Sequence, residues 1–318
     1  MKKFLYKLII FIFIIISAQV ILVRYILPPI PEVKLLDEYL QGKYQVIYFG
    51  DSVLQYTDVS DTDKAGVVKI LSKINQKLTI ADMSFSAYDA GVYEAMMKYI
   101  SRSPYKPEAI IIPIGLRSFS PEWDRRPVYQ FEKQKFILST PPLLADFWRP
   151  LAIFGVIKEN PISDQQFFNT PVYYVKTQIG TVLYFENDEL FASTSPENIR
   201  NKYVYSYMES LSPDHRKLKS LSNLLDSAKE QGIIAYVYIT PLDYEGGQEF
   251  VGPDFMVQTK ANVDLICSIV LSKNVPCLNL AFSLGTEYFS HPLYPSEHLK
   301  QAGREFIAQK VNEFLLKK

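Results

Sequence analysis

A serine and a histidine near opposite ends of the chain have the residue types and surroundings for nucleophilic catalysis. Ser52 follows directly after Gly50 and Asp51, at the end of the apolar run YQVIYF. His298 stands just before the amphipathic segment LKQAGREFIAQKV. A serine hydroxyl becomes a good nucleophile when a neighbouring base accepts its proton, and histidine suits that task near neutral pH. We therefore predict that Ser52 and His298 form a nucleophile–base pair.

Each motif also has a purely structural interpretation. A Gly-Asp-Ser sequence after a strand is also typical of a helix cap that follows a glycine turn. A single loop histidine is usually structural, and the pairing with Ser52 is what favours a catalytic role for His298. The chain has two other histidines, His215 at the start of a predicted solvent-facing helix and His291 in a predicted loop, and neither is as well placed as a base.

The elements that must position this pair alternate along the chain. Strand-length apolar runs occur at 44–50, 78–84, 109–115, 233–240 and 275–281. Helical patterns occur at 63–77, 89–102, 214–231, 255–273 and 299–316. Ser212 is the expected N-cap of the third, which has an apolar stripe at Leu218, Leu221, Leu225 and Ala228. Near-continuous apolar strands alternating with helices predict an α/β fold with a doubly wound parallel sheet. Catalytic groups in such sheets gather at the carboxyl ends of the strands, where Ser52 and His298 both fall.

The N-terminal segment predicts a membrane anchor. Lys2, Lys3 and Lys7 precede an apolar run that continues to Val23, which is long enough to cross a hydrocarbon layer of ~30 Å. The positive charge before this run favours a cytoplasmic N-terminus and an extracytoplasmic domain. A cleaved signal peptide is the alternative, although Ile16 stands where a small residue is preferred for cleavage after Ala18.

Three regions follow from this division. We assign residues 1–28 to the anchor, 29–43 to an extended, proline-stiffened linker, and 44–318 to the α/β domain. An aromatic-rich insertion covers about 117–211 and contains both tryptophans, Trp123 and Trp148. We expect its aromatic residues to pack a small satellite core; a surface on which sugar rings stack is the alternative.

Composition and cysteine content limit the other possibilities. The formal net charge is zero, which gives no indication of a nucleic-acid partner. No metal-ligand spacing or dinucleotide fingerprint occurs, so we expect no metal and no cofactor. Cys267 is expected in a helix and Cys277 on the next strand, and because a helix packs ~10 Å from a sheet we predict two free thiols rather than a disulfide.

The soluble part of the chain resembles the SGNH (GDSL-like) hydrolase superfamily. The matching residues are Gly50, Asp51 and Ser52 in the first motif, and His298-Leu299 with Ala302-Gly303 in the last. The layout is similar to the membrane-anchored SGNH proteins that act beside membrane-bound O-acyltransferases on cell-surface polysaccharides. This resemblance implies a flavodoxin-like sheet and an acyl-enzyme intermediate on the serine.

The chain departs from the family pattern at three places. Pro295 stands where the family has the aspartate of its triad. Glu297 is the candidate acid in its place, and a backbone carbonyl that orients the histidine is the alternative we favour. Arg117 stands where the family has an oxyanion-hole asparagine, so it either stabilises an oxyanion or pairs with an acid of the insertion. The glycine after the second strand is missing, which leaves a backbone N–H of Ser86 or Ala87 beside that of Ser52.

These features predict a serine acyltransferase or esterase that acts on an extracytoplasmic, cell-surface glycan. The anchor favours transfer, with a membrane-bound O-acyltransferase as the expected partner and the bacterial-type cell membrane as the location. A different class of function is the alternative: a catalytically degenerate domain that binds glycan or scaffolds a membrane complex.

Overall fold

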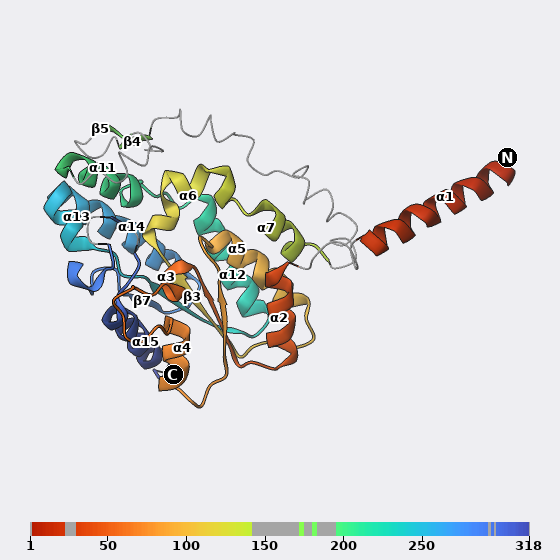
Figure 1. Cartoon of the computed structure of the whole chain (residues 1–318), viewed down its shortest axis with the longest axis horizontal. Helices are drawn as coiled ribbons and strands as arrows, with labels where there is room; N and C mark the ends of the chain where they lie inside the picture. The colour runs from red at the N-terminus through yellow and green to blue at the C-terminus, as the bar shows by residue number, and fades with distance from the viewer. Residues whose placement is uncertain are drawn as a thin grey trace.

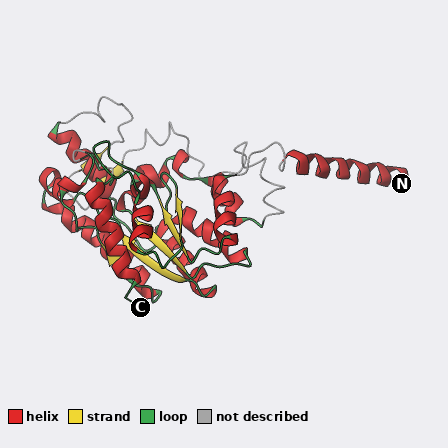
Figure 2. Ribbon diagram, turned by 60° about the horizontal axis from the view of Figure 1, so that its bottom comes forward, coloured by secondary structure: helices red, strands yellow, loops and turns green. Residues whose placement is uncertain are grey.

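A single parallel sheet organises the domain. The computed structural model describes residues 2–22, 30–141, 172–174, 180–182, 195–291, 294–295 and 297–317. Helices surround the sheet in Figures 1 and 2. Five strands lie in the order β2-β1-β3-β6-β7, and all neighbours are parallel. They are β1 (Val46–Gly50), β2 (Ile80–Ser84), β3 (Ala109–Ile114), β6 (Ile234–Ile239) and β7 (Cys277–Asn279). Numbered by their succession in the chain, the strands run 2-1-3-4-5 across the sheet, which is the flavodoxin-like order, so the predicted fold class is confirmed.

Helices cover both faces of this sheet. All five predicted helices are present: α4 (Val67–Ile74), α5 (Ala90–Arg102), α12 (Arg216–Glu230), α14 (Pro253–Ser272) and α15 (Gln301–Leu315). Two short helices accompany them, α3 (Ser52–Gln55) after β1 and α13 (Tyr244–Val251) after β6. Because side chains alternate along a strand, Ile47 and Phe49 pack with α5, α12 and α14, while Val46 and Tyr48 pack with α4 and α15 on the other face. Two apolar cores therefore hold the sheet between two helical layers.

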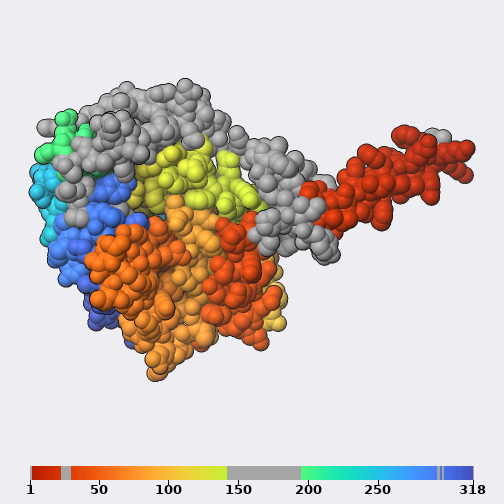
Figure 3. Space-filling model, viewed as in Figure 1, coloured from red at the N-terminus to blue at the C-terminus, as the bar shows by residue number. Residues whose placement is uncertain are grey.

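The linker prediction was wrong from Pro31 onward. Residues Pro31–Gln41 form helix α2, which begins with proline at its first position. Proline is well tolerated there because its fixed φ suits a helix and the first N–H has no intrahelical partner. Leu36 and Leu40 of α2 are buried in the core, and Figure 3 shows α2 lying against the domain instead of leading away from it.

The start of α12 also differs from the prediction. Ser212 was expected to cap this helix, but the N-cap is His215, whose Nδ1 accepts a hydrogen bond of 3.3 Å from the Lys217 N–H. The Ser212 carbonyl instead accepts from the His215 N–H at 3.0 Å, in the turn before the helix. The apolar stripe is as predicted, with Leu218 and Leu221 buried against the sheet.

The described part of the insertion adds no strand to the five-stranded sheet. It contains η2 (Leu116–Phe119), α6 (Pro121–Arg125), η3 (Pro127–Tyr129), α7 (Glu132–Ser139), a separate antiparallel pair β4 (Val172–Tyr174) and β5 (Gly180–Val182), and α11 (Pro196–Tyr207). Trp123 is buried and stacks on Tyr129 with 5.5 Å between ring centroids, which is internal packing of the expected kind. Trp148 lies outside the described residues, and a sugar-stacking surface stays a prediction.

The cysteine prediction was wrong, because Cys267 and Cys277 form a disulfide with 5.5 Å between their Cα atoms. The ~10 Å layer spacing used in the prediction is measured from the helix axis, and a Cα on the near side of a helix lies ~2.3 Å closer to the sheet. In addition, β7 is an edge strand that can lie beside the end of α14. A disulfide is typical of proteins in an oxidising compartment.

The N-terminal helix α1 spans Lys2–Ile21. It has a mean hydropathy of 2.4 and none of its residues is buried, so it is long and apolar enough to cross a membrane. A signal sequence has the same properties, and the permanent anchor therefore stays a prediction.

Candidate active site

The turn from β1 into α3 fixes the position of Ser52. Gly50 ends β1, and a Cβ at this position would lie 2.3 Å from the Leu54 side chain, so the close packing here requires glycine. Asp51 is the N-cap of α3, and its Oδ1 accepts a hydrogen bond of 2.9 Å from the Val53 N–H. Ser52 is therefore the first residue of a helix at the carboxyl edge of the sheet.

His298 reaches the same edge from the segment that precedes α15. Phe289 and Leu299 form an isolated antiparallel bridge, and the Ser290 N–H donates to the His298 carbonyl at 2.9 Å. The Nε2 atom of His298 lies 3.1 Å from the Oγ atom of Ser52, which is hydrogen-bond distance. The structure thus brings together the two residues that the sequence pairs across 246 positions.

The imidazole of His298 stacks on an aromatic ring that the sequence did not single out. The rings of Tyr56 and His298 have centroids 4.1 Å apart and planes 8° from parallel. The Tyr56 hydroxyl lies 3.2 Å from Nε2 of His291. The available signal was the spacing of Ser52 and Tyr56, since residues i and i+4 share one face of a helical turn.

His298 is in its basic form at neutral pH. Burial lowers its pKa to about 4, and the positive charge of Arg117 and the proximity of His291 act in the same direction. Above about pH 4 the ring is therefore neutral, and in the tautomer with the proton on Nδ1 its Nε2 can accept the serine proton.

Glu297 is buried beside the dyad, but its carboxylate is bonded to other partners. Oε1 accepts a hydrogen bond of 3.2 Å from the Arg117 N–H, and Oε2 accepts one of 3.4 Å from the Thr240 hydroxyl. A Cβ on Gly115 would lie 2.6 Å from Oε2, so a glycine is needed there to admit the carboxylate. The residue itself has a left-handed φ of 57°. Glu297 thus joins the ends of β3 and β6 to the histidine segment.

Burial and like charge raise the pKa of two carboxyl groups here. Burial, and then the proximity of Asp51, raises the pKa of Glu297 to about 7. Burial also raises the pKa of Asp51 to about 6, against the opposing effects of the Val53 N–H and Arg117. Two neighbouring buried carboxyl groups favour having at least one of them protonated.

Arg117 lies near the dyad, in an aromatic setting. Its Nη2 donates a hydrogen bond of 3.1 Å to the Tyr294 hydroxyl, and its guanidinium lies 5.3 Å from the Trp123 ring centroid and 5.4 Å from that of Tyr294. Its charge lowers the pKa of His298, which places positive potential at the dyad. Arg117 therefore contacts an aromatic residue of the insertion, Trp123, and also acts electrostatically on the site. Its role as an oxyanion donor or as the partner of an acid stays a prediction.

Two backbone N–H groups complete the set of candidates for an oxyanion site. The N–H of Ser52 belongs to the first turn of α3 and has no intrahelical acceptor. Ser86 is exposed in the turn after β2, and that turn is tied to the site by a 3.0 Å hydrogen bond from the Phe85 N–H to the Gly50 carbonyl. The roles of Ser52, Arg117 and Ser86 as oxyanion donors stay predictions.

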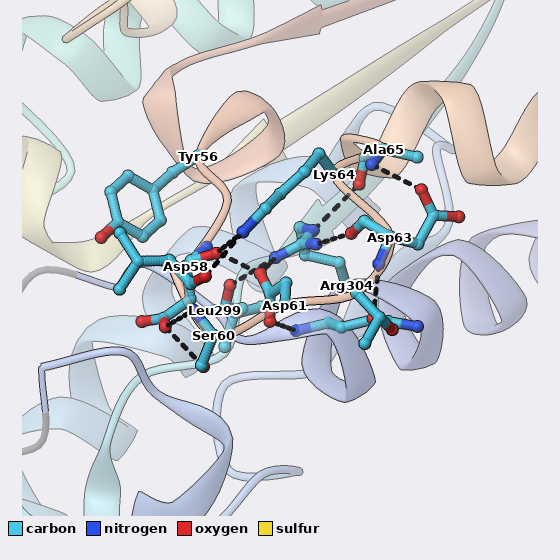
Figure 4. Close-up of polar contacts among 12 residues, drawn as sticks. Tyr56, Asp58, Ser60, Asp61, Asp63, Lys64, Ala65, Leu299 and Arg304 are labelled. Atoms are coloured by element: carbon cyan, nitrogen blue, oxygen red, sulfur yellow. Dashed lines mark hydrogen bonds and ion pairs between the residues drawn. The ribbon is translucent and has the colours of Figure 1, made fainter.

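A buried arginine joins the two segments that carry the dyad (Figure 4). Arg304 of α15 is fully buried and pairs with Asp61 at 2.7 Å. It also donates to the carbonyls of Asp63, Ala65 and Leu299 at 2.9, 3.0 and 2.9 Å. The loop that follows α3 is thereby attached to the residue directly after His298.

The described residues contain no group of three or more histidine, cysteine, aspartate or glutamate side chains that could hold a metal ion.

Comparison with solved structures finds proteins of similar fold. It is similar to a variant of Axe2, an acetyl-xylooligosaccharide esterase from Geobacillus stearothermophilus, with 12% identity and a TM-score of 0.42 over 86% of this chain and 95% of the other. It is also similar to an inhibitor-bound aryl esterase from M. smegmatis, with 10% identity and a TM-score of 0.40 over 85% of this chain and 97% of the other. No protein-family model and no curated protein matches the chain.

Similarities at this level of identity bear on the fold alone. The flavodoxin-like strand order, read from the strand pairing itself, agrees with the fold that the SGNH resemblance implied. The chemistry of this chain has to follow from its own residues.

Proposed function

We propose that the domain performs serine-based acyl chemistry, with Ser52 as nucleophile and His298 as general base. The observation that carries this proposal is the 3.1 Å distance between Ser52 Oγ and His298 Nε2 at the carboxyl edge of the sheet. A neutral imidazole in contact with a serine at the first position of a helix is an arrangement that activates the hydroxyl. The neutral state follows from the lowered pKa of His298.

The reaction has two stages, acylation of Ser52 and then deacylation. Ser52 Oγ attacks the ester carbonyl carbon while its proton passes to His298 Nε2, and the carbonyl oxygen becomes an oxyanion near the Ser52 N–H and Arg117. The oxyanion then collapses, the C–O bond to the leaving alcohol breaks, and the alcohol takes the proton from His298. Water or a sugar hydroxyl next attacks the acyl carbon of the acyl-serine while its proton passes to His298 Nε2. The bond between that carbon and Ser52 Oγ then breaks, Ser52 takes the proton from His298, and an acid or a new ester is released.

The acceptor we propose is a hydroxyl of an extracytoplasmic glycan, with hydrolysis of a glycan ester as the other outcome of the same intermediate. The apolar helix α1 would keep the domain beside a membrane, where a membrane-bound acyltransferase could supply the acyl group. The disulfide between Cys267 and Cys277 supports an oxidising, extracytoplasmic location.

A binding or scaffolding domain is the second candidate, and one observation favours it. Pro295 stands where the resemblance expects an acidic residue, and the carboxylate of Glu297 is bonded to Arg117 and Thr240. In serine hydrolases the acid of the triad contributes strongly to turnover, so the change at this position favours a domain that binds without catalysing.

Labelling with a fluorophosphonate separates the two candidates. We expect the full chain in detergent to be labelled, Ser52→Ala to remain unlabelled, and the control Ser101→Ala, at a partly exposed helix position, to react like wild type. Absence of labelling of the folded wild-type chain across pH 5–9 would exclude the enzyme and leave the binding function.

Topology is tested separately. We expect protease added to intact spheroplasts to digest the domain, because the basic residues before α1 favour a cytoplasmic N-terminus. Mature protein that begins near Gln19 would show that the segment is a cleaved signal and contradict the anchor.

A further inference from the structure

We propose that Tyr56 is the positioning residue of the dyad, whose ring holds the plane of His298 and stabilises the imidazolium formed when Ser52 reacts. This inference rests on the proposed function and extends it to a residue outside the predicted motifs. The stacked geometry carries it: ring centroids 4.1 Å apart and planes 8° from parallel.

One helical turn supplies both contacts to the imidazole. The Tyr56 N–H donates to the Ser52 carbonyl at 2.8 Å, which closes the single turn of α3 and places the two side chains on the same face. Ser52 meets the edge of the His298 ring at Nε2, and Tyr56 covers its face. The serine and the support of its base are therefore fixed relative to each other by local backbone structure.

The two contacts constrain different motions. A single hydrogen bond fixes the distance between Oγ and Nε2, but the imidazole can still tilt about that contact. Stacking against a ring fixes the tilt. In a full triad a carboxylate performs this orientation and compensates the charge of the imidazolium. Here the face of Tyr56, which carries the negative side of the ring quadrupole, lies within the ~6 Å at which it attracts a cation.

The tyrosine ring is also held through its hydroxyl end. Its hydroxyl contacts Nε2 of His291 at 3.2 Å, and the centroids of these two rings are 5.8 Å apart. His291 is exposed, so this contact steadies the ring from the solvent side. The titratable and charged groups around His298 are then Arg117 from η2, His291 and Glu297 from its own segment, and Asp51 before α3.

The test is the kinetics of fluorophosphonate labelling of the full chain, resolved into the affinity for the reagent and the rate of the chemical step. We expect Tyr56→Leu to slow the chemical step roughly tenfold, the order of a partly desolvated cation–π contact, with an affinity within about twofold of wild type. Tyr56→Phe and Tyr56→Trp should restore most of the rate, because they keep an aromatic face. Tyr105→Leu, an exposed tyrosine elsewhere, is the matched control.

Each result has one meaning. A rate for Tyr56→Leu equal to that of wild type would overturn the positioning role, and so would a rate for Tyr56→Phe as low as that for Tyr56→Leu, because the hydroxyl and not the ring would then matter. A loss confined to affinity would also overturn it. An unlabelled wild-type chain would instead overturn the proposed function, and this inference with it. Thermal unfolding of each variant shows whether a slow rate reflects an unfolded domain.

Discussion

The two halves of the site are built in different ways. Ser52 stands on regular structure: a strand, a glycine, an aspartate cap and one turn of helix, all within 46–56. His298 stands on an irregular segment between η4 (Thr286–Tyr288) and α15. This segment contains a left-handed residue at Glu297 and an isolated bridge between Phe289 and Leu299. The nucleophile is therefore positioned by local backbone geometry.

The base is positioned by contacts that are distant in sequence. Tyr56 stacks on its ring, Arg304 attaches the next residue to the loop after α3, and Glu297 attaches the preceding residue to β3 and β6. We therefore expect changes to Ser52 and His298 themselves to act on the chemistry. Changes to the contacts that hold the His298 segment should act on stability as well.

Removing the base itself should have the largest effect. We expect His298→Gln to slow labelling of Ser52 by ~10²–10⁴-fold, the usual contribution of general base catalysis, with little change in the melting temperature. His215→Gln is the matched control, since that ring caps α12 away from the dyad. A labelling rate within a few-fold of wild type for His298→Gln would mean that another group activates Ser52.

Arg304 is remote from the chemistry but holds the histidine segment in place. Replacement by methionine leaves the carboxylate of Asp61, whose side chain is 4% exposed, without its counter-charge. Burial by itself raises the pKa of Asp61. The hydrogen bonds from Arg304 and from the Gln301 N–H outweigh this effect and bring the pKa below its ordinary value, so the native carboxylate is charged. We expect Arg304→Met to lower the free energy of unfolding by ~3–5 kcal/mol, measured by urea denaturation.

The exposed pair of Lys73 and Asp63 provides the control for this experiment. Lys73→Met should cost less than ~1 kcal/mol, because solvent-exposed pairs contribute little. Equal losses for the two variants would show that the Arg304 network does not hold the segment.

The pH dependence of labelling tests the state of the imidazole. Since the pKa of His298 is lowered to about 4, the fraction of neutral base is constant above pH 5 and falls as pH drops through 4. We expect the labelling rate to fall ~10-fold per unit below that value, because only the neutral ring accepts the proton. Circular dichroism at pH 3.5 must show a folded domain, and a midpoint near the ordinary 6.5 would mean an imidazole exposed to solvent.

The sequence predicts the Ser52 side of the site better than the contacts that hold His298. Alternating apolar strands and amphipathic helices predicted the sheet and the position of Ser52, because these signals are local. The meeting of Ser52 and His298 followed from topology, since the carboxyl ends of parallel strands share one edge. The stack of Tyr56 on His298 depends on a contact between segments more than 170 residues apart, which no local pattern encodes. The same holds for the ion pair of Arg304 with Asp61 and for the hydrogen bond from the Arg117 N–H to Glu297.

The errors had specific physical causes. Helix α2 was taken as extended linker because prolines were counted as breakers, although proline favours the first position of a helix. The disulfide was excluded because the layer spacing of the fold was applied to an edge strand, where a cysteine near the end of α14 reaches Cys277. Both errors applied an average rule at the end of an element.

Glu297→Gln should have the smallest effect on chemistry and a measurable effect on stability. The glutamine oxygen can still accept from the Arg117 N–H, and its amide can donate to Thr240, so we expect labelling within a few-fold of wild type.

The folded pKa of Glu297 is about 7, above its ordinary 4.5, because of burial and Asp51. Between these values the unfolded chain has lost the proton that the folded chain keeps, so stability falls as pH rises through this window and stays lower above it. Because glutamine does not ionise, Glu297→Gln should raise the free energy of unfolding by up to ~3 kcal/mol relative to wild type at pH 8 but not at pH 4. The control Glu287→Gln should show no such difference between the two pH values. A loss of several orders of magnitude in labelling, with the fold intact, would instead make Glu297 the acid of a full triad, and the base would then depend on a charge in its own segment more than on contacts from distant ones.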